Sequence, residues 1–284
     1  MVEVIESGGA LGAEIRGVDL RKPFDAATAQ AVKDAFYRHE VVYFRGQDID
    51  DDDQIRFSAH FGEVRQTKFT KLYENDAVIK PEIFVVSNIK RDGAYIGAYD
   101  AGLFWHTDGA FLKHPHIASA LRAIEVPEAD GRTLGDTRYA SMTAAYQALP
   151  QAMKKRLHGL QVLHTVMLRF KKTVDSGIKK DEFTSDIKQE AEAIHALVKP
   201  HPVTGRLGLF ISEGYASHIV GMPEDESRAL LAELNAFVTQ PQFQYLHNWR
   251  AKDLVLWDDC TTLHKATFDY ALPQRRLMHR TTIG

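Results

Sequence analysis

The tripeptide His106-Thr107-Asp108 restricts the possible folds and functions of this chain more than any other stretch of the sequence. In a β-strand, side chains two positions apart point to the same face, so this spacing would bring an imidazole and a carboxylate to one point. We therefore expect the residues around 104–108 to form a strand that presents both groups together. The pair alone is weak evidence, because His-x-Asp also occurs by chance as a surface polar pair.

A third candidate metal ligand lies much later in the chain. His264 follows the apolar run at 254–257, whose composition is typical of a buried strand. Together with His106 and Asp108 it would complete a two-histidine, one-carboxylate triad, which suits a non-haem Fe(II) centre with open coordination positions. The same ligand types also bind Zn²⁺ in catalytic sites, so a zinc hydrolase is an alternative.

Two arginines close to the C-terminus add a binding function to this centre. Arg276 and Arg280 are four positions apart, so on a strand they would share a face. A guanidinium offers two parallel donors to a carboxylate. A metal triad beside such arginines suits a cofactor with two carboxylates, one end chelating iron and the other clamped, and 2-oxoglutarate is such a molecule. The alternative is a basic strand on the surface.

Length and charge restrict the class of protein. The 284 residues allow one large domain or two small ones. The net charge of −3 provides no basic field for nucleic acid or an anionic membrane. The single cysteine, Cys260, indicates a reducing compartment. Because we find neither a signal-peptide pattern nor an apolar run long enough to span a bilayer, we expect a cytoplasmic protein.

Strand-like segments dominate both halves of the candidate site, which favours a mainly β fold with flanking helices, a barrel or jelly roll. Helices are predicted at 25–38, 142–149 and 224–238, and the acidic residues 50–53 are expected at a further helix N-terminus. The polar stretch 62–100 is predicted to be a lid over the substrate. Residues 171–196 are predicted to form a mobile surface excursion.

Several motifs together resemble the taurine dioxygenase / 2,4-dichlorophenoxyacetate dioxygenase (TauD/TfdA) family of Fe(II)- and 2-oxoglutarate-dependent oxygenases. The resemblance covers nearly the whole chain, and its most specific block is the last one. The matching stretches are 11–20, 41–47, Trp105-His106-Thr107-Asp108, Gly135-Asp136-Thr137, 201–205, Trp257-Asp258-Asp259 before His264, and Arg275-Arg276-Leu277-Met278-His279-Arg280. The resemblance implies a double-stranded β-helix, or jelly roll, that extends over residues 1–284 as a single domain.

The resemblance also implies roles for individual residues. His106, Asp108 and His264 would hold Fe(II), while Arg276 and Thr137 would bind the distal carboxylate of 2-oxoglutarate. Arg280 would lie near the iron-bound end of the cofactor and within reach of an anionic substrate. The implied reaction consumes 2-oxoglutarate and O2, hydroxylates a small organic acid of the carboxylate or aryloxyalkanoate kind, and releases succinate and CO2. We also expect a homo-oligomer, either a dimer or a tetramer.

The sequence departs from the family at several positions. Asp259 and Cys260 stand where the family often has Asn and Arg, which we expect to alter the bonding around the ligands without loss of iron. The three positions that hold histidine, tyrosine and asparagine in taurine-specific members are occupied here by Thr67, Thr70 and Gly102, which argues against taurine.

The alternatives are an alkylsulfonate dioxygenase, an isonitrile-forming enzyme acting on an N-carboxymethyl amino acid, and a metal-free barrel that binds ligands. Short stretches at 102–106 and 210–214 resemble the isonitrile-forming branch.

Other residues have weaker claims to a role. His114 and His116 flank a proline and are expected to be exposed loop histidines. Lys68, Lys71, Arg169 and Lys171 would either help to bind an anion or be solvated surface charges. Tyr73, Tyr95, Tyr99 and Phe104 would form either an apolar pocket wall or ordinary packing at the mouth of a barrel.

Overall fold

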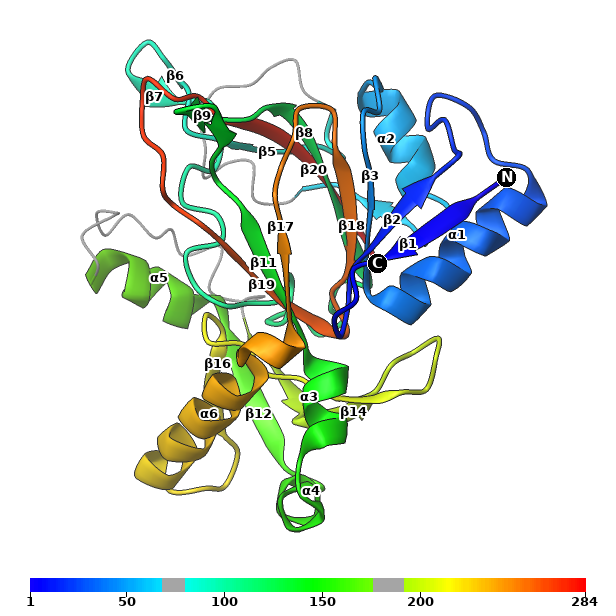
Figure 1. Ribbon diagram of the computed structural model, residues 1–284. Coiled ribbons are helices and arrows are strands. Elements are labelled where there is room, and N and C mark those ends of the chain that lie inside the picture. The colour runs from blue at the N-terminus through cyan, green and yellow to red at the C-terminus, as the bar shows by residue number, and fades with distance from the viewer. Residues whose placement is uncertain (68–79, 176–191) are drawn as a thin grey trace.

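The computed structural model describes residues 1–67, 80–175 and 192–284. A large sheet of eight strands forms one layer of the molecule (Figure 1). Seven strands follow the spatial order β1, β2, β3, β18, β8, β20, β4, and β5 also pairs with β20. These strands are β1 (Glu3–Glu6), β2 (Ala13–Arg16), β3 (Val41–Phe44), β4 (Val64–Arg65), β5 (Phe84–Ser87), β8 (Ala118–Glu125), β18 (Leu254–Asp258) and β20 (Leu277–Ile283).

The remaining strands form smaller sheets. A three-stranded sheet has β11 at its centre, and a second has β12 at its centre. Their strands are β17 (Gln244–His247), β11 (Thr137–Ser141) and β19 (Thr262–Ala266), then β13 (Glu192–Ala196), β12 (Gln161–Thr165) and β16 (Ala216–Ile219). Three two-stranded ribbons are β6 (Lys90–Arg91) with β7 (Ala94–Tyr95), β9 (Glu128–Ala129) with β10 (Arg132–Thr133), and β14 (Val198–Pro200) with β15 (Leu207–Leu209).

The helices are α1 (Ala26–His39), α2 (Asp51–Ser58), α3 (Met142–Ala148), α4 (Gln151–Leu157), α5 (Val166–Asp175), α6 (Glu224–Val238) and the short 3-10 helix η3 (Pro241–Phe243). Local sequence explains where two of them begin. The Asp25 carboxylate accepts the Thr28 backbone N–H at the start of α1. Asp50 and Asp53 form a capping box at the start of α2, which confirms the predicted helix N-terminus in the acidic cluster. None of the helices in the described parts of the chain has the length and apolar character needed to cross a bilayer.

Successive side chains of β18 belong alternately to two hydrophobic cores, one on each side of the large sheet. Leu254 and Leu256 pack on the side covered by α1 and α2, and Val255 and Trp257 pack on the opposite side. Tyr139 of β11 belongs to the same core as Val255 and Trp257. The interior between the large sheet and the three-stranded sheet around β11 is therefore apolar along these strands, and the candidate site lies at one end of it.

The secondary structure of two segments differs from the prediction. Residues 192–196, expected in a mobile excursion, form β13, which pairs with β12 through the whole of its length. Residues 104–108 do not form a strand, so that prediction is wrong: His106 makes only an isolated bridge with His264. Turns at Gly102 and Gly109, which have φ of 88° and 69°, flank this segment and leave no room for a regular strand.

Candidate metal centre

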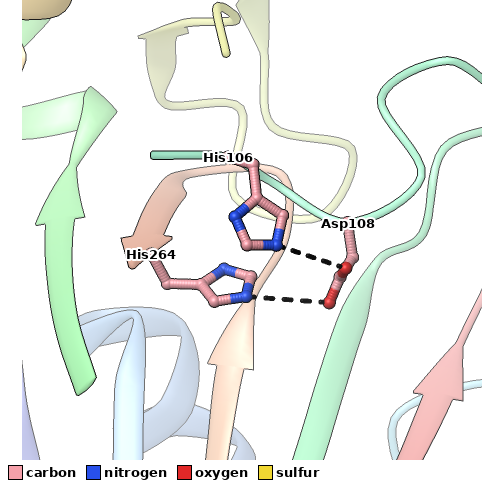
Figure 2. A group of neighbouring side chains, drawn as sticks. All are labelled: His106, Asp108 and His264. Carbon is pink, nitrogen blue, oxygen red and sulfur yellow. Dashed lines mark ion pairs between the residues drawn. The ribbon is translucent and has the colours of Figure 1, made fainter. Parts of the chain in front are cut away.

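The two candidate histidines are brought together by their own backbones. The His106 N–H donates to the His264 carbonyl at 3.1 Å, and the His264 N–H donates to the His106 carbonyl at 2.8 Å. The bridge holds the two imidazole rings with their centroids 4.1 Å apart (Figure 2). Because His264 belongs to β19 and β19 pairs with β11, the sheet determines where both rings lie.

Asp108 completes the group that the sequence predicted. Its two carboxylate oxygens lie 3.8 Å from His106 Nε2 and 3.9 Å from His264 Nε2 (Figure 2). The ligand atoms of the three residues lie within 4.8 Å of one another, and all three side chains are buried. An irregular segment thus achieves the convergence that we expected from a strand.

The protonation of the histidines is that of metal ligands. His106 Nδ1 lies 2.8 Å from the Phe104 carbonyl, which must accept a hydrogen from it, so the lone pair of the neutral ring is on Nε2, facing Asp108. Burial lowers the pKa of His106 and lowers that of His264 well below its ordinary value. Both rings are therefore neutral at pH 7, the form that binds metal.

Asp108 is held ionised by its neighbours. Burial opposes ionisation, but the positive charge of the Arg280 guanidinium outweighs this effect and keeps the pKa of Asp108 well below its usual range. Arg280 Nη1 donates to Asp108 Oδ2 at 2.7 Å. Arg280 is therefore a direct partner of the candidate metal ligand, a contact that the sequence did not predict, and its buried Nε has no hydrogen-bond partner among the described residues.

A second layer of bonds fixes the carboxylate. Asp259 Oδ1 accepts the Asp108 N–H at 3.3 Å and the Trp257 indole N–H at 2.9 Å. The Ser119 hydroxyl lies 2.7 Å from Asp259 Oδ2 and 3.4 Å from Asp108 Oδ2. The residue that replaces the family's asparagine thus supports the ligand loop from behind and does not contribute to the triad.

The residues predicted to hold a dicarboxylate are also buried close to the site. Arg276 is only 3% exposed, and the described parts of the chain provide no acidic partner for it and no hydrogen-bond partner for its Nε. An unpaired buried cation is costly, so this guanidinium is suited to an anionic ligand. Thr137 is buried as well, and its oxygen accepts the Trp249 indole N–H at 2.9 Å, which leaves the hydroxyl hydrogen for another acceptor.

A second group of possible ligands, His201, Asp258 and Cys260, also converges within 4.8 Å. His201 Nδ1 accepts the backbone N–H groups of Val203 and Thr204 at 3.1 and 2.9 Å. The proton of the neutral ring is therefore on Nε2, which lies 3.0 Å from Asp258 Oδ2 and cannot at the same time present a lone pair to a metal. This group is a buried histidine–carboxylate contact beside a thiol, not a second metal centre.

The structure describes only some of the other histidine, basic and aromatic residues that the sequence suggested for the site. His114 is exposed as predicted, but His116 is half-buried with its ring against Gly109, so the expectation of two exposed histidines is wrong for His116. Arg169 lies 4.0 Å from Asp100, and Lys171 is exposed. Tyr95 and Tyr99 stack with their ring centroids 4.0 Å apart. Three of the predicted contributors, Lys68, Lys71 and Tyr73, and the taurine-position residue Thr70, lie outside the described residues.

Sequence reasoning missed two residues of the interior, Ser119 and Tyr139. Tyr139 follows Thr137 by two positions in β11, so the two-residue period of a strand would have predicted that it faces the same interior. Ser119 had no such signal, because its role depends on where Asp259 lies across the pairing of β8 with β18.

Two buried neutral imidazoles and one buried carboxylate that converge on a single point define a mononuclear metal centre of the facial-triad class. The model of the family described as "Taurine catabolism dioxygenase TauD, TfdA family" matches residues 3–282. The chain belongs to this family of alpha-ketoglutarate-dependent dioxygenases, oxidoreductases that use Fe(II), 2-oxoglutarate (alpha-ketoglutarate) and O2.

Individual relatives agree with this assignment. The chain is 33% identical to the alpha-ketoglutarate-dependent 2,4-dichlorophenoxyacetate dioxygenase of Burkholderia sp. (strain RASC), over 95% of this chain and 91% of the relative. It is 31% identical to the alpha-ketoglutarate-dependent sulfate ester dioxygenase of Pseudomonas putida, over 100% and 89%. The solved structure of AAD-2 in complex with Mn(II) and N-oxalylglycine superposes with a TM-score of 0.80 at 30% identity, covering 100% of this chain and 97% of that one.

Proposed function

We propose that this dioxygenase hydroxylates a small organic acid and that His106, Asp108 and His264 hold its iron. The observation that carries the proposal is the convergence of three buried ligand atoms within 4.8 Å beside a buried arginine without an acidic partner. The first part fits Fe(II), and the second fits the far carboxylate of 2-oxoglutarate. Arg276 and Thr137 would bind that carboxylate.

The residues of the chain contribute binding and geometry to the reaction. When bound, the iron and 2-oxoglutarate supply the oxidising chemistry that activates O2. Arg280 keeps Asp108 ionised and in place through the 2.7 Å bond, and the Phe104 carbonyl keeps the His106 lone pair on Nε2. Burial of the three ligands excludes water from their side of the centre, and the backbone bridge between His106 and His264 holds these two side by side.

The substrate is proposed to carry its anionic group close to Arg280. Arg280 already balances Asp108, but its buried Nε has no partner among the described residues and its guanidinium lies 4.7 Å above the Phe84 ring. An arginine donor beside an aromatic face suits a carboxylate on an apolar body. The name of the 2,4-dichlorophenoxyacetate dioxygenase relative is in line with an aryloxyalkanoate.

We expect substrate-dependent succinate release to fall at least about tenfold when an aryloxyacetate is replaced by its methyl ester, because a hydrogen bond to a charged group contributes roughly 1.5–3 kcal/mol. The measurement is a succinate and O2-uptake assay with Fe(II) and 2-oxoglutarate over small carboxylates, sulfonates and aryloxyalkanoates. The amide of the best acid is a second neutral analogue of similar shape. Equal coupling by acid, ester and amide would show that the pocket selects shape and not charge.

A sulfate ester or alkylsulfonate is the second candidate substrate. Two relatives favour it, the sulfate ester dioxygenase of Pseudomonas putida and an alkylsulfatase of Acinetobacter baylyi that is 29% identical over 97% of this chain. The same arginine donor would accept a sulfate oxygen as readily as a carboxylate oxygen. Alkyl sulfates in the same assay distinguish the two classes, because only the true substrate class will couple succinate release to its own consumption.

Residues 1–284 are proposed to form a single domain with a double-stranded β-helix (jelly-roll) fold. The family model, which covers residues 3–282, supports one domain, and the two facing sheets around the site support the fold. Residues 68–79 of the predicted lid (62–100) and residues 176–191 of the predicted excursion (171–196) lie outside the described residues. Within the described parts of these two segments, β5 belongs to the large sheet and residues 171–175 belong to α5.

A homo-oligomer, dimer or tetramer, is also proposed. The exposed apolar side chains of Leu246 in β17 and Phe268 just after β19 support it. Light scattering should give a mass that is two or four times the 32.0 kDa of one chain, and a mass of one chain at micromolar concentration would exclude both.

A further inference from the structure

The hydroxyl of Tyr139 is a buried polar group without a partner. The residue is 0% exposed, and its Oη has no hydrogen-bond partner among the described residues. Tyr139 is at the centre of β11, where its register partners are His264 on β19 and Tyr245 on β17. Leaving a buried hydroxyl unsatisfied costs roughly 1–3 kcal/mol, and a phenylalanine of nearly the same shape would avoid that cost. The hydroxyl therefore requires a partner from outside the described chain.

The surroundings of Tyr139 place that partner in the cofactor region. Its ring lies with its centroid 6.0 Å from that of His264 at an interplanar angle of 27°, and 5.8 Å from that of Trp257. Thr137 precedes it by two positions on the same strand face. A Cβ at Gly135, two positions earlier again, would lie 3.3 Å from Arg276 Nε, so the Arg276 side chain lies beside the segment that leads into β11.

The three polar groups that meet here can all donate. Burial raises the pKa of Tyr139 well above its ordinary value, which the charge of Arg276 only partly counteracts, so the phenol keeps its proton. The Thr137 oxygen is already occupied by the Trp249 indole N–H, and Arg276 Nε has no acceptor among the described residues. Each of the three buried groups therefore has a hydrogen to donate, and a carboxylate, with two oxygens and about four acceptor sites, can accept from all of them.

We propose that Tyr139 is a further cosubstrate-binding residue, whose hydroxyl donates a hydrogen bond to the carboxylate of 2-oxoglutarate that Arg276 and Thr137 bind. The inference rests on the proposed function of Arg276 and adds a third donor to it. The ring has a separate role, which is to pack between Tyr245 and His264 and so to support the metal centre.

Tyr139→Phe isolates the hydroxyl because it retains the ring. We expect the Kd of the Mn(II)-loaded protein for 2-oxoglutarate, measured by calorimetry without turnover, to rise about ten- to a hundredfold. The kcat at saturating 2-oxoglutarate should change little. The melting temperature without ligand should stay the same or increase, because the variant removes an unsatisfied group. Tyr245→Phe is the matched control, since that hydroxyl lies 3.2 Å from His247 Nδ1, and its Kd should equal that of the parent.

Four outcomes would overturn the proposal. An unchanged Kd with a lower melting temperature would show that the hydroxyl bonds a structural water. Failure of Tyr139→Phe to fold would show that the hydroxyl already has an essential partner within the protein. An unchanged Kd in Tyr139→Phe together with a raised Kd in Arg276→Leu would reject Tyr139 alone, whereas an unchanged Kd in both variants would reject the whole cosubstrate site.

Discussion

Asp108→Ala is expected to abolish 2-oxoglutarate turnover and to leave the chain without bound iron. The carboxylate is the only anionic member of the proposed triad, and its oxygens lie within 4 Å of both imidazole Nε2 atoms. Two neutral histidines alone form a much weaker and less selective site for Fe(II). The measurements are iron bound per chain after anaerobic loading and succinate formed per chain. Normal iron content with full activity would remove Asp108 from the ligand set.

Loss of fold must be separated from loss of the ligand, because Asp108 also balances Arg280. Removal of one partner of a buried ion pair costs about 3–5 kcal/mol. Asp51→Ala is a suitable control. It removes a carboxylate that pairs with Arg122 and with His279. His279 precedes Arg280 in β20, but none of these residues belongs to the triad. This control should lose stability in a thermal melt but retain iron and turnover. If both variants lose turnover together, destabilisation alone would account for the effect of Asp108→Ala.

Arg276→Leu is expected to raise the KM for 2-oxoglutarate about ten- to a hundredfold, because a hydrogen bond to a charged group contributes roughly 1.5–3 kcal/mol. The leucine also removes a buried cation without an acidic partner, so the ligand-free protein should not be destabilised by loss of an ion pair. Initial rates of succinate release over a range of 2-oxoglutarate concentrations provide the measurement.

The adjacent arginine is the natural control for this prediction. Arg275 is half-exposed and pairs with Glu125 at 3.1 Å on the surface, so Arg275→Leu should leave the KM unchanged. The two side chains differ in burial although they are neighbours in a run of similar residues, because successive residues of an extended segment point to opposite faces. If the KM rose for Arg275→Leu but not for Arg276→Leu, Arg275 and not Arg276 would be the residue that binds the carboxylate.

Much of the secondary structure could be predicted because its causes are local. The caps Asp25 and Asp50 mark the starts of α1 and α2 within one helical turn of their hydrogen-bond donors. The apolar segment at 254–257 indicated β18, since a buried strand needs little more than a run of apolar residues. The wrong prediction at 104–108 has a local cause too, because glycines at 102 and 109 with positive φ break the segment.

The sequence by itself determined which side chains are candidates for the site of this protein: two histidines and one carboxylate for the metal, and the arginines near the C-terminus for an anion. Only the tertiary structure decided how these groups meet. The backbone bridge between His106 and His264 joins segments that are far apart in the chain, and no local pattern encodes it. The pairing of Arg280 with Asp108 and the isolation of Arg276 and the Tyr139 hydroxyl likewise depend on which side chains the packed sheets place nearby. Hydrogen bonding and charge act through space, so these properties arise only once the chain has folded.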